Sequence, residues 1–232
     1  MPGRTRQESP EEQFVTNAAH ELQSPLTAIV SAVEVLQAGA KDTPERDIFL
    51  DHIEQAAARL VRSTRALLVL SRVQTRLEAP RTELVELEPL LSDIAARAKT
   101  QEDVELAVSC PAGAAVVTNR ELVEHAVFNV LSNATNYTKN GRIELSARLN
   151  GGAAEISISD TGPGIPEAEQ ARVFERFYRG VGATDYGSGL GLAITRAAIE
   201  AAGGFTELES TVGTGTTVRF RFPQGASLVV AE

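Results

Sequence analysis

His20 is the first residue along the chain whose type and position could support chemistry. It shares one side of a predicted helix with polar residues: Gln13, Asn17, Ser24, Thr27, Ser31 and Glu34. The imidazole is therefore expected to project into water, where it can react. Glu21 follows directly, and its carboxylate can accept a hydrogen bond from one ring nitrogen and raise the basicity of the other. This pair is typical of a nucleophilic histidine, whereas position alone would indicate an ordinary surface histidine.

Two asparagines in the second half of the chain could bind a metal ion and phosphate. Asn129 and Asn133 are four residues apart in a predicted helix, so their amides lie on one face. Their carbonyl oxygens can bind Mg²⁺ or its water shell, and their NH₂ groups can bind phosphate. An exposed polar face is the simpler interpretation when this pair is taken alone.

The segment DTGPGIP, residues 160–166, follows a predicted strand and could recognise a base. The carboxylate of Asp160 can accept a hydrogen bond from the amino group of adenine, where guanine carries a carbonyl. Gly162 and Gly164 allow the backbone to turn closely around the base. A glycine-rich turn is a weak indication by itself, because most such turns are ordinary loops.

Three alternating glycines stand at the start of a later predicted helix: Gly187, Gly189 and Gly191. Backbone N–H groups at a helix start can bind phosphate, because the helix dipole favours negative charge there. The preceding stretch contains Gly180 and Gly182, has few apolar residues, and is predicted to form a lid over the ligand. Phe174 and Phe177 are expected to pack the base of this lid rather than contact the ligand.

Two long helices must carry His20. From Glu11 to about Ala38 the apolar residues recur every three or four positions: Val15, Ala19, Leu22, Leu26, Ile29, Val33 and Leu36. A second stripe begins at Pro44 and fades near Arg76, and the segment 39–44 joins the two helices into a hairpin. Pairing of two such hairpins into a four-helix bundle would cover both stripes.

The chain is predicted to divide into two domains, 1–80 and 81–232, at a polar linker, residues 78–83, that contains Pro80. The second domain is predicted to be α+β. Its strands are expected at 84–87, 104–109, 114–119, 142–149, 153–160, 205–210 and 216–222, and its helices at 89–100, at 121–137 and from about Gly191. The segment GTGTT, residues 213–217, is interpreted only as a hairpin turn.

Composition excludes several classes of protein. With 232 residues, 43% of them hydrophobic, the chain can build packed cores. Its one cysteine, Cys110, excludes an intrachain disulfide and a Cys-rich metal site, which fits a reducing cytoplasm. The net charge of −9 opposes nucleic-acid binding. No apolar stretch approaches the roughly 20 residues that span a bilayer, so a cytoplasmic location is expected, and membrane attachment through an earlier segment stays open.

The segment FVTNAAHELQSPLTAI, residues 14–29, resembles the phosphoacceptor box of sensor histidine kinases. In that box His-Glu is followed, after one further residue, by a polar residue, a hydroxyl or amide residue, and then Pro-Leu. The resemblance implies that His20 is the phosphorylated residue and that Glu21 assists it. In family members that also dephosphorylate their partner, the residue matching Ser24 helps to position water. Ser24 stands where threonine or asparagine is usual, and Ala19 and Gln23 replace a usual serine and arginine.

The later segments resemble the boxes of the GHKL (Bergerat-type) ATP-binding fold, in the order N, G1, F and G2. They are NVLSNATNY at 129–137, DTGPGIP at 160–166, VFERFYRG at 173–180, and the glycines at 187–191. The resemblance implies an α/β sandwich that binds ATP and Mg²⁺ through the residues named above, together with Tyr137 and Leu190. Asn136 stands where a lysine or arginine that contacts phosphate is usual.

Taken together, the resemblance implies a homodimeric kinase core that autophosphorylates His20 and passes the phosphoryl group to an aspartate of a response regulator receiver domain. Asn136 and Gln23 motivate one alternative, an ATP-binding dimeric pseudokinase with weak or no transfer. Hsp90-type chaperones, MutL-type repair proteins and gyrase-type topoisomerases share the nucleotide fold, so a chaperone- or repair-type ATPase is the second alternative. The hairpin with His20 argues against it. His52 and His125 are interpreted as ordinary histidines without a role.

Overall fold

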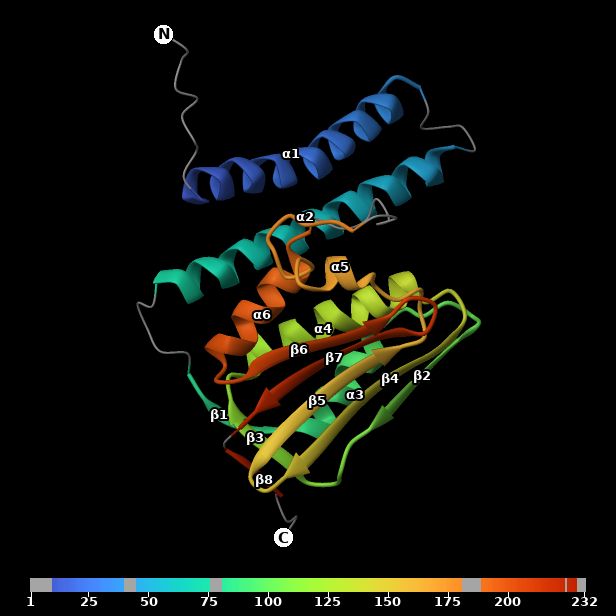
Figure 1. The fold of residues 1–232 in the computed structure, drawn as a ribbon. Helices are drawn as coiled ribbons and strands as arrows, with labels where there is room; N and C mark the ends of the chain where they lie inside the picture. The colour runs from blue at the N-terminus through green and yellow to red at the C-terminus, as the bar shows by residue number, and fades with distance from the viewer. Residues whose placement is uncertain (1–9, 40–44, 76–80, 181–188, 224, 229–232) are drawn as a thin grey trace. The chain divides into compact units, whose positions relative to one another are not determined.

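The computed structural model describes residues 10–39, 45–75, 81–180, 189–223 and 225–228 (Figure 1). The chain divides into two compact units, Met1–Leu68 and Val69–Glu232. His20 lies in the first unit, and all the segments predicted to bind a nucleotide lie in the second. Within the described residues, no helix combines the length and the apolar character needed to cross a membrane.

The first unit is built from two long helices, as the apolar spacing predicts. Helix α1 spans Pro10–Gln37, and α2, which spans Arg46–Thr75, continues past the end of the unit. α1 runs on through Pro25, which has no N–H to donate within the helix and whose side chain is buried. Gly39 follows α1 with a φ of 134°, a conformation that glycine adopts readily. The predicted end of the first helix before the joining segment 39–44 is confirmed.

The apolar surface of α1 is wider than one buried stripe. Pro25, Ala32 and Leu36 are buried. Leu26 and Val33, which the spacing places on the predicted stripe, are 51% and 36% exposed. The buried residues Pro25 and Ala32 follow a line shifted by one position, which the same three- and four-residue spacing also fits. The expectation that a second hairpin covers Leu26 and Val33 stays a prediction. An apolar surface therefore remains exposed on α1.

The second unit is a two-layer α/β sandwich, and the predicted α+β class is confirmed. Its main sheet has the strand order β2-β4-β5-β7-β6 (Figure 1). The strands are β2 Val104–Ser109, β4 Gly141–Asn150, β5 Ala153–Asp160, β6 Phe205–Thr211 and β7 Gly215–Phe222. Neighbouring strands are antiparallel, except that β2 and β4 are parallel. A second sheet has the order β1-β3-β8, with β1 Glu83–Glu86, β3 Ala114–Thr118 and β8 Ala226–Leu228.

Three helices cover one face of the main sheet (Figure 1): α3 Leu87–Arg97, α4 Arg120–Tyr137 and α6 Gly191–Ala201. A short helix, α5, spans Glu167–Gln170. α4 begins after Asn119, whose side-chain oxygen accepts a hydrogen bond from the Leu122 N–H at 2.9 Å. This bond satisfies one of the N–H groups that a helix start leaves without a partner. It fixes the start of the helix that carries the predicted metal site.

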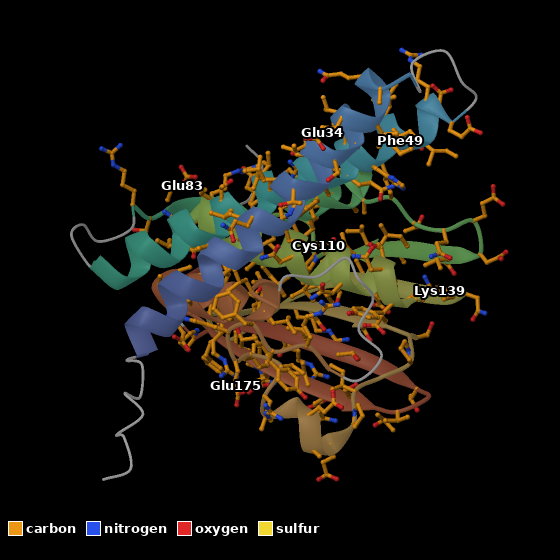
Figure 2. All side chains as sticks on the ribbon, turned by 90° about the horizontal axis from the view of Figure 1, so that it is seen from above. Glu34, Phe49, Glu83, Cys110, Lys139 and Glu175 are labelled. Carbon is orange, nitrogen blue, oxygen red and sulfur yellow. The ribbon has the colours of Figure 1, made fainter. Side chains whose placement is uncertain are left out.

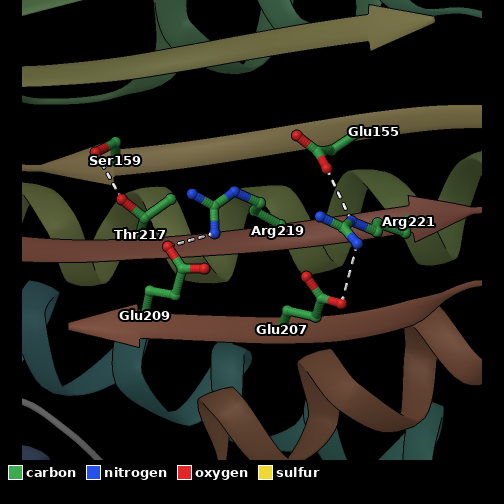
Figure 3. Close-up of polar contacts among 7 residues, drawn as sticks. All are labelled: Glu155, Ser159, Glu207, Glu209, Thr217, Arg219 and Arg221. Carbon is green, nitrogen blue, oxygen red and sulfur yellow. Dashed lines mark hydrogen bonds and ion pairs between the residues drawn. The ribbon is translucent and has the colours of Figure 1, made fainter. Parts of the chain in front are cut away.

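The main sheet separates an apolar face from a charged one. On β5, Ile156 is fully buried, whereas its neighbour Glu155 points to the opposite face, as the pleat requires. Figure 3 shows this outer face, where the Arg221 guanidinium pairs with Glu155 at 2.8 Å and with Glu207 at 3.2 Å. The row continues with Arg219 and Glu209 at 2.8 Å, and with Ser159 and Thr217 at 2.9 Å. Such exposed pairs contribute about 1 kcal/mol or less each, so the buried face holds the layers together.

The predicted order of elements is confirmed, with two additions. Neither α5 nor β8 is predicted from the sequence. β8 follows the hairpin expected to close the chain and pairs antiparallel with β3. It is a strand of three residues whose partner is distant in the sequence, so no local pattern indicates it. The predicted linker, 78–83, falls partly outside the described residues, at 78–80, and its last residue, Glu83, begins β1.

Candidate nucleotide site and phosphoacceptor helix

Helix α4 presents the two asparagines of the predicted metal site. Asn129 and Asn133 are half-buried, and Tyr137 ends the helix with 36% of its surface exposed. Asn129 Nδ2 lies 3.2 Å from His125 Nε2 and 3.5 Å from the Gly191 carbonyl oxygen. An amide nitrogen only donates, so both N–H groups of Asn129 have acceptors within the protein. Asn129 therefore has its Oδ1, rather than a donor, to offer to a ligand.

Asp160 lies at the end of β5, where backbone donors orient its carboxylate. Its Oδ1 accepts hydrogen bonds from the Gly162 N–H at 2.8 Å and from the Thr216 N–H at 3.3 Å. A Cβ on Gly162 would lie only 2.8 Å from this oxygen. Both donors meet Oδ1, so Oδ2 can accept from a ligand such as an adenine amino group. Burial raises the pKa of the carboxyl above its ordinary value, and the two N–H groups oppose this rise.

The loop that follows β5 is held against the hairpin of β6 and β7. Gly164 has a φ of 71°, and a Cβ there would collide with the Thr211 carbonyl oxygen. The Ile165 N–H donates to Ser210 Oγ at 2.8 Å. Gln170 Nε2 donates to the Ser210 carbonyl oxygen, also at 2.8 Å. These contacts fix the loop that the sequence predicts to surround a base.

The turn between β6 and β7 also supports the site. The register of β5 and β7 places Asp160 opposite Thr216. Gly215 has a φ of 134°, and a Cβ there would collide with the Asp160 carbonyl oxygen. The Gly213 N–H donates to the Pro163 carbonyl oxygen at 2.8 Å. The segment GTGTT is a hairpin turn, as predicted, but it also holds the backbone and the carboxylate of Asp160.

A glycine-to-alanine pair tests this packing. Gly215→Ala is expected to lower the free energy of unfolding by about 3 kcal/mol, because both backbone strain and a steric clash oppose the new methyl group. Gly213→Ala is the control. Gly213 also has a positive φ, 78°, but nothing lies within 4 Å of the position that a Cβ would take, so the cost is about 1 kcal/mol. Urea unfolding followed by circular dichroism measures both; equal losses would contradict the close packing at Gly215.

The start of α6 provides backbone donors. Gly189 and Gly191 lie there, whereas Gly187 falls outside the described residues. α6 begins at Gly191, and no side chain at the N-cap position accepts a hydrogen bond from it. As in every helix, the first N–H groups have no acceptor within the helix itself. A helix start of this kind favours phosphate. Leu190 is fully buried between the two glycines.

Gly189 also ties this helix start to the base of the predicted lid. Its carbonyl oxygen accepts a hydrogen bond from the Phe177 N–H at 2.9 Å, and a Cβ on Gly189 would lie 2.6 Å from the Phe177 carbonyl carbon. Phe174 is 8% exposed, and the Arg196 guanidinium of α6 lies 4.0 Å from the centre of its ring. Phe174 therefore packs against α6. The predicted lid itself falls largely outside the described residues, at 181–188.

The four predicted segments meet in one region of the second unit. Asn129 joins α4 to the start of α6 through the Gly191 carbonyl. The other end of α4 meets the loop after β5, because a Cβ on Gly162 would lie 3.4 Å from Thr138 Oγ1.

The described residues contain no cluster of three His, Cys, Asp or Glu side chains that could hold a metal ion.

His20, Glu21 and Ser24 lie on α1, in the first unit. The backbone at His20 and Glu21 is helical, and their side chains fall outside the described part of the structure. Ser24 is exposed, together with later residues of the same predicted polar side: Thr27, Ser31 and Glu34. The expectation that this side faces solvent is confirmed for these four residues.

Two family models match successive parts of the chain. Residues 11–76 match the His Kinase A (phospho-acceptor) domain, and residues 118–226 match the family described as histidine kinase-, DNA gyrase B-, and HSP90-like ATPase. The first match contains His20 on α1, and the second contains every segment of the candidate nucleotide site. The chain belongs to the histidine kinase family.

Relatives of this kinase chain agree with both matches. The sensor-like histidine kinase SenX3 of Mycolicibacterium smegmatis is 33% identical over 226 residues, which cover 94% of the kinase chain and 59% of SenX3. The chain thus spans little more than half of this relative. The crystal structure of full-length ShkA in complex with AMPPNP has the same fold, with a TM-score of 0.66 at 24% identity, over 96% of this chain and 47% of ShkA. The mycobacterial sensor histidine kinase MprB matches at 28% identity with a TM-score of 0.55, over 64% of this chain and 100% of the MprB chain.

Asn136 departs from the basic residue usual at its position in the kinase family. It is exposed near the end of α4. Lys139 follows three residues later, and its Nζ donates to the Asn136 carbonyl oxygen at 3.3 Å. Figure 2 shows Lys139 near the edge of the second unit. The kinase therefore has a cation close to this position, although not on the helix itself.

Sequence reasoning did not single out three residues that contact the candidate site: His125, Gly215 and Thr216. The first could have been found, because His125 precedes Asn129 by four residues on one helix and so lies on the same face. Gly215 and Thr216 reach Asp160 only through the pairing of β5 with β7. That pairing joins segments far apart in the sequence, so spacing alone does not indicate it.

Proposed function

We propose that this chain is the catalytic core of a sensor histidine kinase, which transfers the γ-phosphoryl group of ATP to a ring nitrogen of His20. The observation that carries the proposal is the presence, in one chain, of a phosphoacceptor helix and a nucleotide site assembled from separate segments. We place the functional boundary at residues 80 and 81, between the end of α2 at Thr75 and the start of β1 at Glu83.

Adenine recognition follows from the carboxylate of Asp160. Its Oδ1 is occupied by two backbone N–H groups, and Oδ2 accepts from the amino group of the base. Gly162 and Gly164 let the loop approach the base, and Tyr137 borders it from the end of α4. The backbone at Gly189, Leu190 and Gly191, with Gly187, donates to the phosphates at the start of α6. The ShkA structure holds AMPPNP, which supports nucleotide binding by this fold.

The side chains of α4 fit a magnesium ion. Asn129 presents Oδ1 once both of its N–H groups are engaged, and Asn133 lies one turn further along the helix. Amide oxygens are hard ligands of the kind that Mg²⁺ accepts together with the phosphate oxygens of a nucleotide. Bound there, Mg²⁺ would offset the negative charge of the phosphates.

His20 is the nucleophile. The lone pair of one ring nitrogen attacks the γ-phosphorus in line with the oxygen that bridges to the β-phosphate. The nitrogen–phosphorus bond forms, the bridging bond breaks, and ADP leaves with the electron pair. Glu21 accepts the N–H of the other ring nitrogen, which keeps the attacking nitrogen unprotonated and then takes the proton that the charged ring releases.

The phosphoryl group then passes from His20 to an aspartate of a response regulator receiver domain, and Ser24 orients water when the phosphoryl group is hydrolysed instead.

The active form is a homodimer. Its support is the apolar surface of α1, where Leu26, Val30 and Val33 are 51%, 48% and 36% exposed in the single chain and a second copy would cover them. We place the core in the cytoplasm, which fits its use of ATP and its single thiol.

Labelling with γ-labelled ATP and Mg²⁺ tests the proposal. The chain is expected to acquire label that is lost in acid and kept in base, as a phosphoramidate is, and that maps to a peptide containing α1. Nucleotide binding without label would overturn the kinase function and leave an ATP-binding scaffold. Continuous ADP release from an unlabelled chain would indicate an ATPase instead.

A further inference from the structure

A hydrogen bond on α4 links a residue without a proposed role to the magnesium site. His125 and Asn129 lie one helical turn apart, and His125 Nε2 lies 3.2 Å from Asn129 Nδ2. The amide nitrogen can only donate, so the ring nitrogen accepts. In this contact the neutral ring of His125 carries its proton on Nδ1. With the amide oriented in this way, Asn129 therefore donates and the imidazole accepts.

The other N–H of Asn129 has a poorer acceptor. Asn129 Nδ2 lies 3.5 Å from the Gly191 carbonyl oxygen, at the limit of a hydrogen bond. This long contact alone holds the amide weakly, because an amide can rotate by half a turn and exchange its oxygen with its nitrogen. Rotation would present NH₂ in place of Oδ1, and NH₂ has no lone pair for a cation. The shorter bond to His125 adds to this contact and opposes the exchange while the ring proton stays on Nδ1, because Nε2 then only accepts.

We propose that His125 is a positioning residue, which fixes the amide of Asn129 so that Oδ1 faces the nucleotide-bound Mg²⁺. This inference rests on the proposed magnesium role of Asn129. His125 does not touch the ion or the substrate. It supplies one acceptor to a metal ligand, and loss of such outer contacts typically lowers metal affinity by 10- to 100-fold.

Two substitutions, H125Q and H125L, distinguish the role of the ring nitrogen as a hydrogen-bond acceptor from the role of the ring in packing. The glutamine Oε1 in H125Q reaches about as far as Nε2 and can accept from Asn129. The leucine in H125L fills similar space and accepts nothing. If His125 is a positioning residue, H125Q should keep Mg²⁺-dependent ATP binding and H125L should lose it. If His125 only packs, H125L should bind as well as H125Q or better.

The readout is nucleotide binding rather than turnover. The dissociation constant for ATP is measured by calorimetry in EDTA and across a Mg²⁺ titration, on the whole chain. H125L is expected to shift the Mg²⁺ midpoint upward about 10-fold with little change in EDTA, and H125Q is expected to stay within about twofold of wild type. His52→Leu, on the exposed side of α2, is the matched control and should leave both values unchanged.

Asn129→Ala separates this inference from the function on which it rests. If N129A loses the Mg²⁺ dependence and H125L keeps it, His125 has no positioning role and the proposed magnesium site stands. If N129A also keeps the dependence, Asn129 is not a magnesium ligand and His125 has no ligand to position, so both of these roles are wrong. Equal losses in H125Q and H125L would overturn the acceptor role, because only the glutamine side chain can accept from Asn129.

Discussion

His20→Ala is expected to reduce labelling from γ-labelled ATP to background, a loss of at least about 1,000-fold. Alanine removes the only atoms of residue 20 that can form a bond to phosphorus, so no slower version of the same step remains. ATP affinity is expected to stay at the wild-type value, because the nucleotide site lies in the second unit. Labelling and calorimetry on the same preparation measure both quantities. Together they distinguish loss of the nucleophile from loss of the nucleotide.

His52→Ala is the matched control for this loss. His52 lies in the same helical unit, is exposed, and stacks edge-on against Phe49 with ring centres 6.3 Å apart. It lacks a glutamate as its next neighbour, and labelling should persist when it is replaced. Label that remains in the His20→Ala chain but disappears with His52→Ala would place the phosphoacceptor on α2 and contradict the proposed mechanism.

The sequence predicts those parts of the molecule that depend on local periodicity. The three- and four-residue spacing of apolar positions gives α1 and α2 to within a few residues, and alternation gives the core strands of the main sheet. The same reasoning places Asn129 and Asn133 on one face of α4. Each of these inferences needs only neighbours within one or two turns of the chain.

The parts that the sequence does not predict depend on distant partners. Spacing cannot decide whether Leu26 or Pro25 lies on the buried line of α1, because both lines satisfy it. The strand β8 is recognised only by its pairing with β3. Likewise, the residue type of Asp160 indicates an acceptor, but only the N–H groups of Gly162 and Thr216 show which oxygen is already occupied.

Asp160→Asn is expected to weaken ATP binding by about 100-fold, or about 2.7 kcal/mol. The amide replaces one of two acceptor oxygens by a donor, and each orientation creates a conflict. With its oxygen towards the N–H groups of Gly162 and Thr216, its NH₂ faces the adenine amino group. In the reverse orientation, its NH₂ faces those two N–H groups instead. Every arrangement leaves donors facing each other in a partly buried site, which is costly.

Glu155→Gln is the control on the same strand. It makes the same change of acid to amide on the outer face of the sheet, where Glu155 pairs with Arg221 at 2.8 Å (Figure 3). ATP affinity should not change, because this face is opposite to the helices that carry the site. Calorimetric titration with ATP compares the two variants, and a wild-type affinity in D160N would exclude Asp160 as the adenine acceptor.

The pH dependence of ATP binding gives a second test of the same carboxylate. Burial raises the pKa of Asp160 in the free chain, and binding requires the ionised form as acceptor, so protonation competes with ATP. Affinity is therefore expected to be full above this raised pKa and to fall as the pH drops through it, at a higher pH than for an ordinary aspartate. D160N has no carboxyl to protonate at this position, so its profile reports the titration of ATP and of the remaining groups of the chain. A wild-type profile parallel to that of D160N would show that Asp160 does not accept from the base.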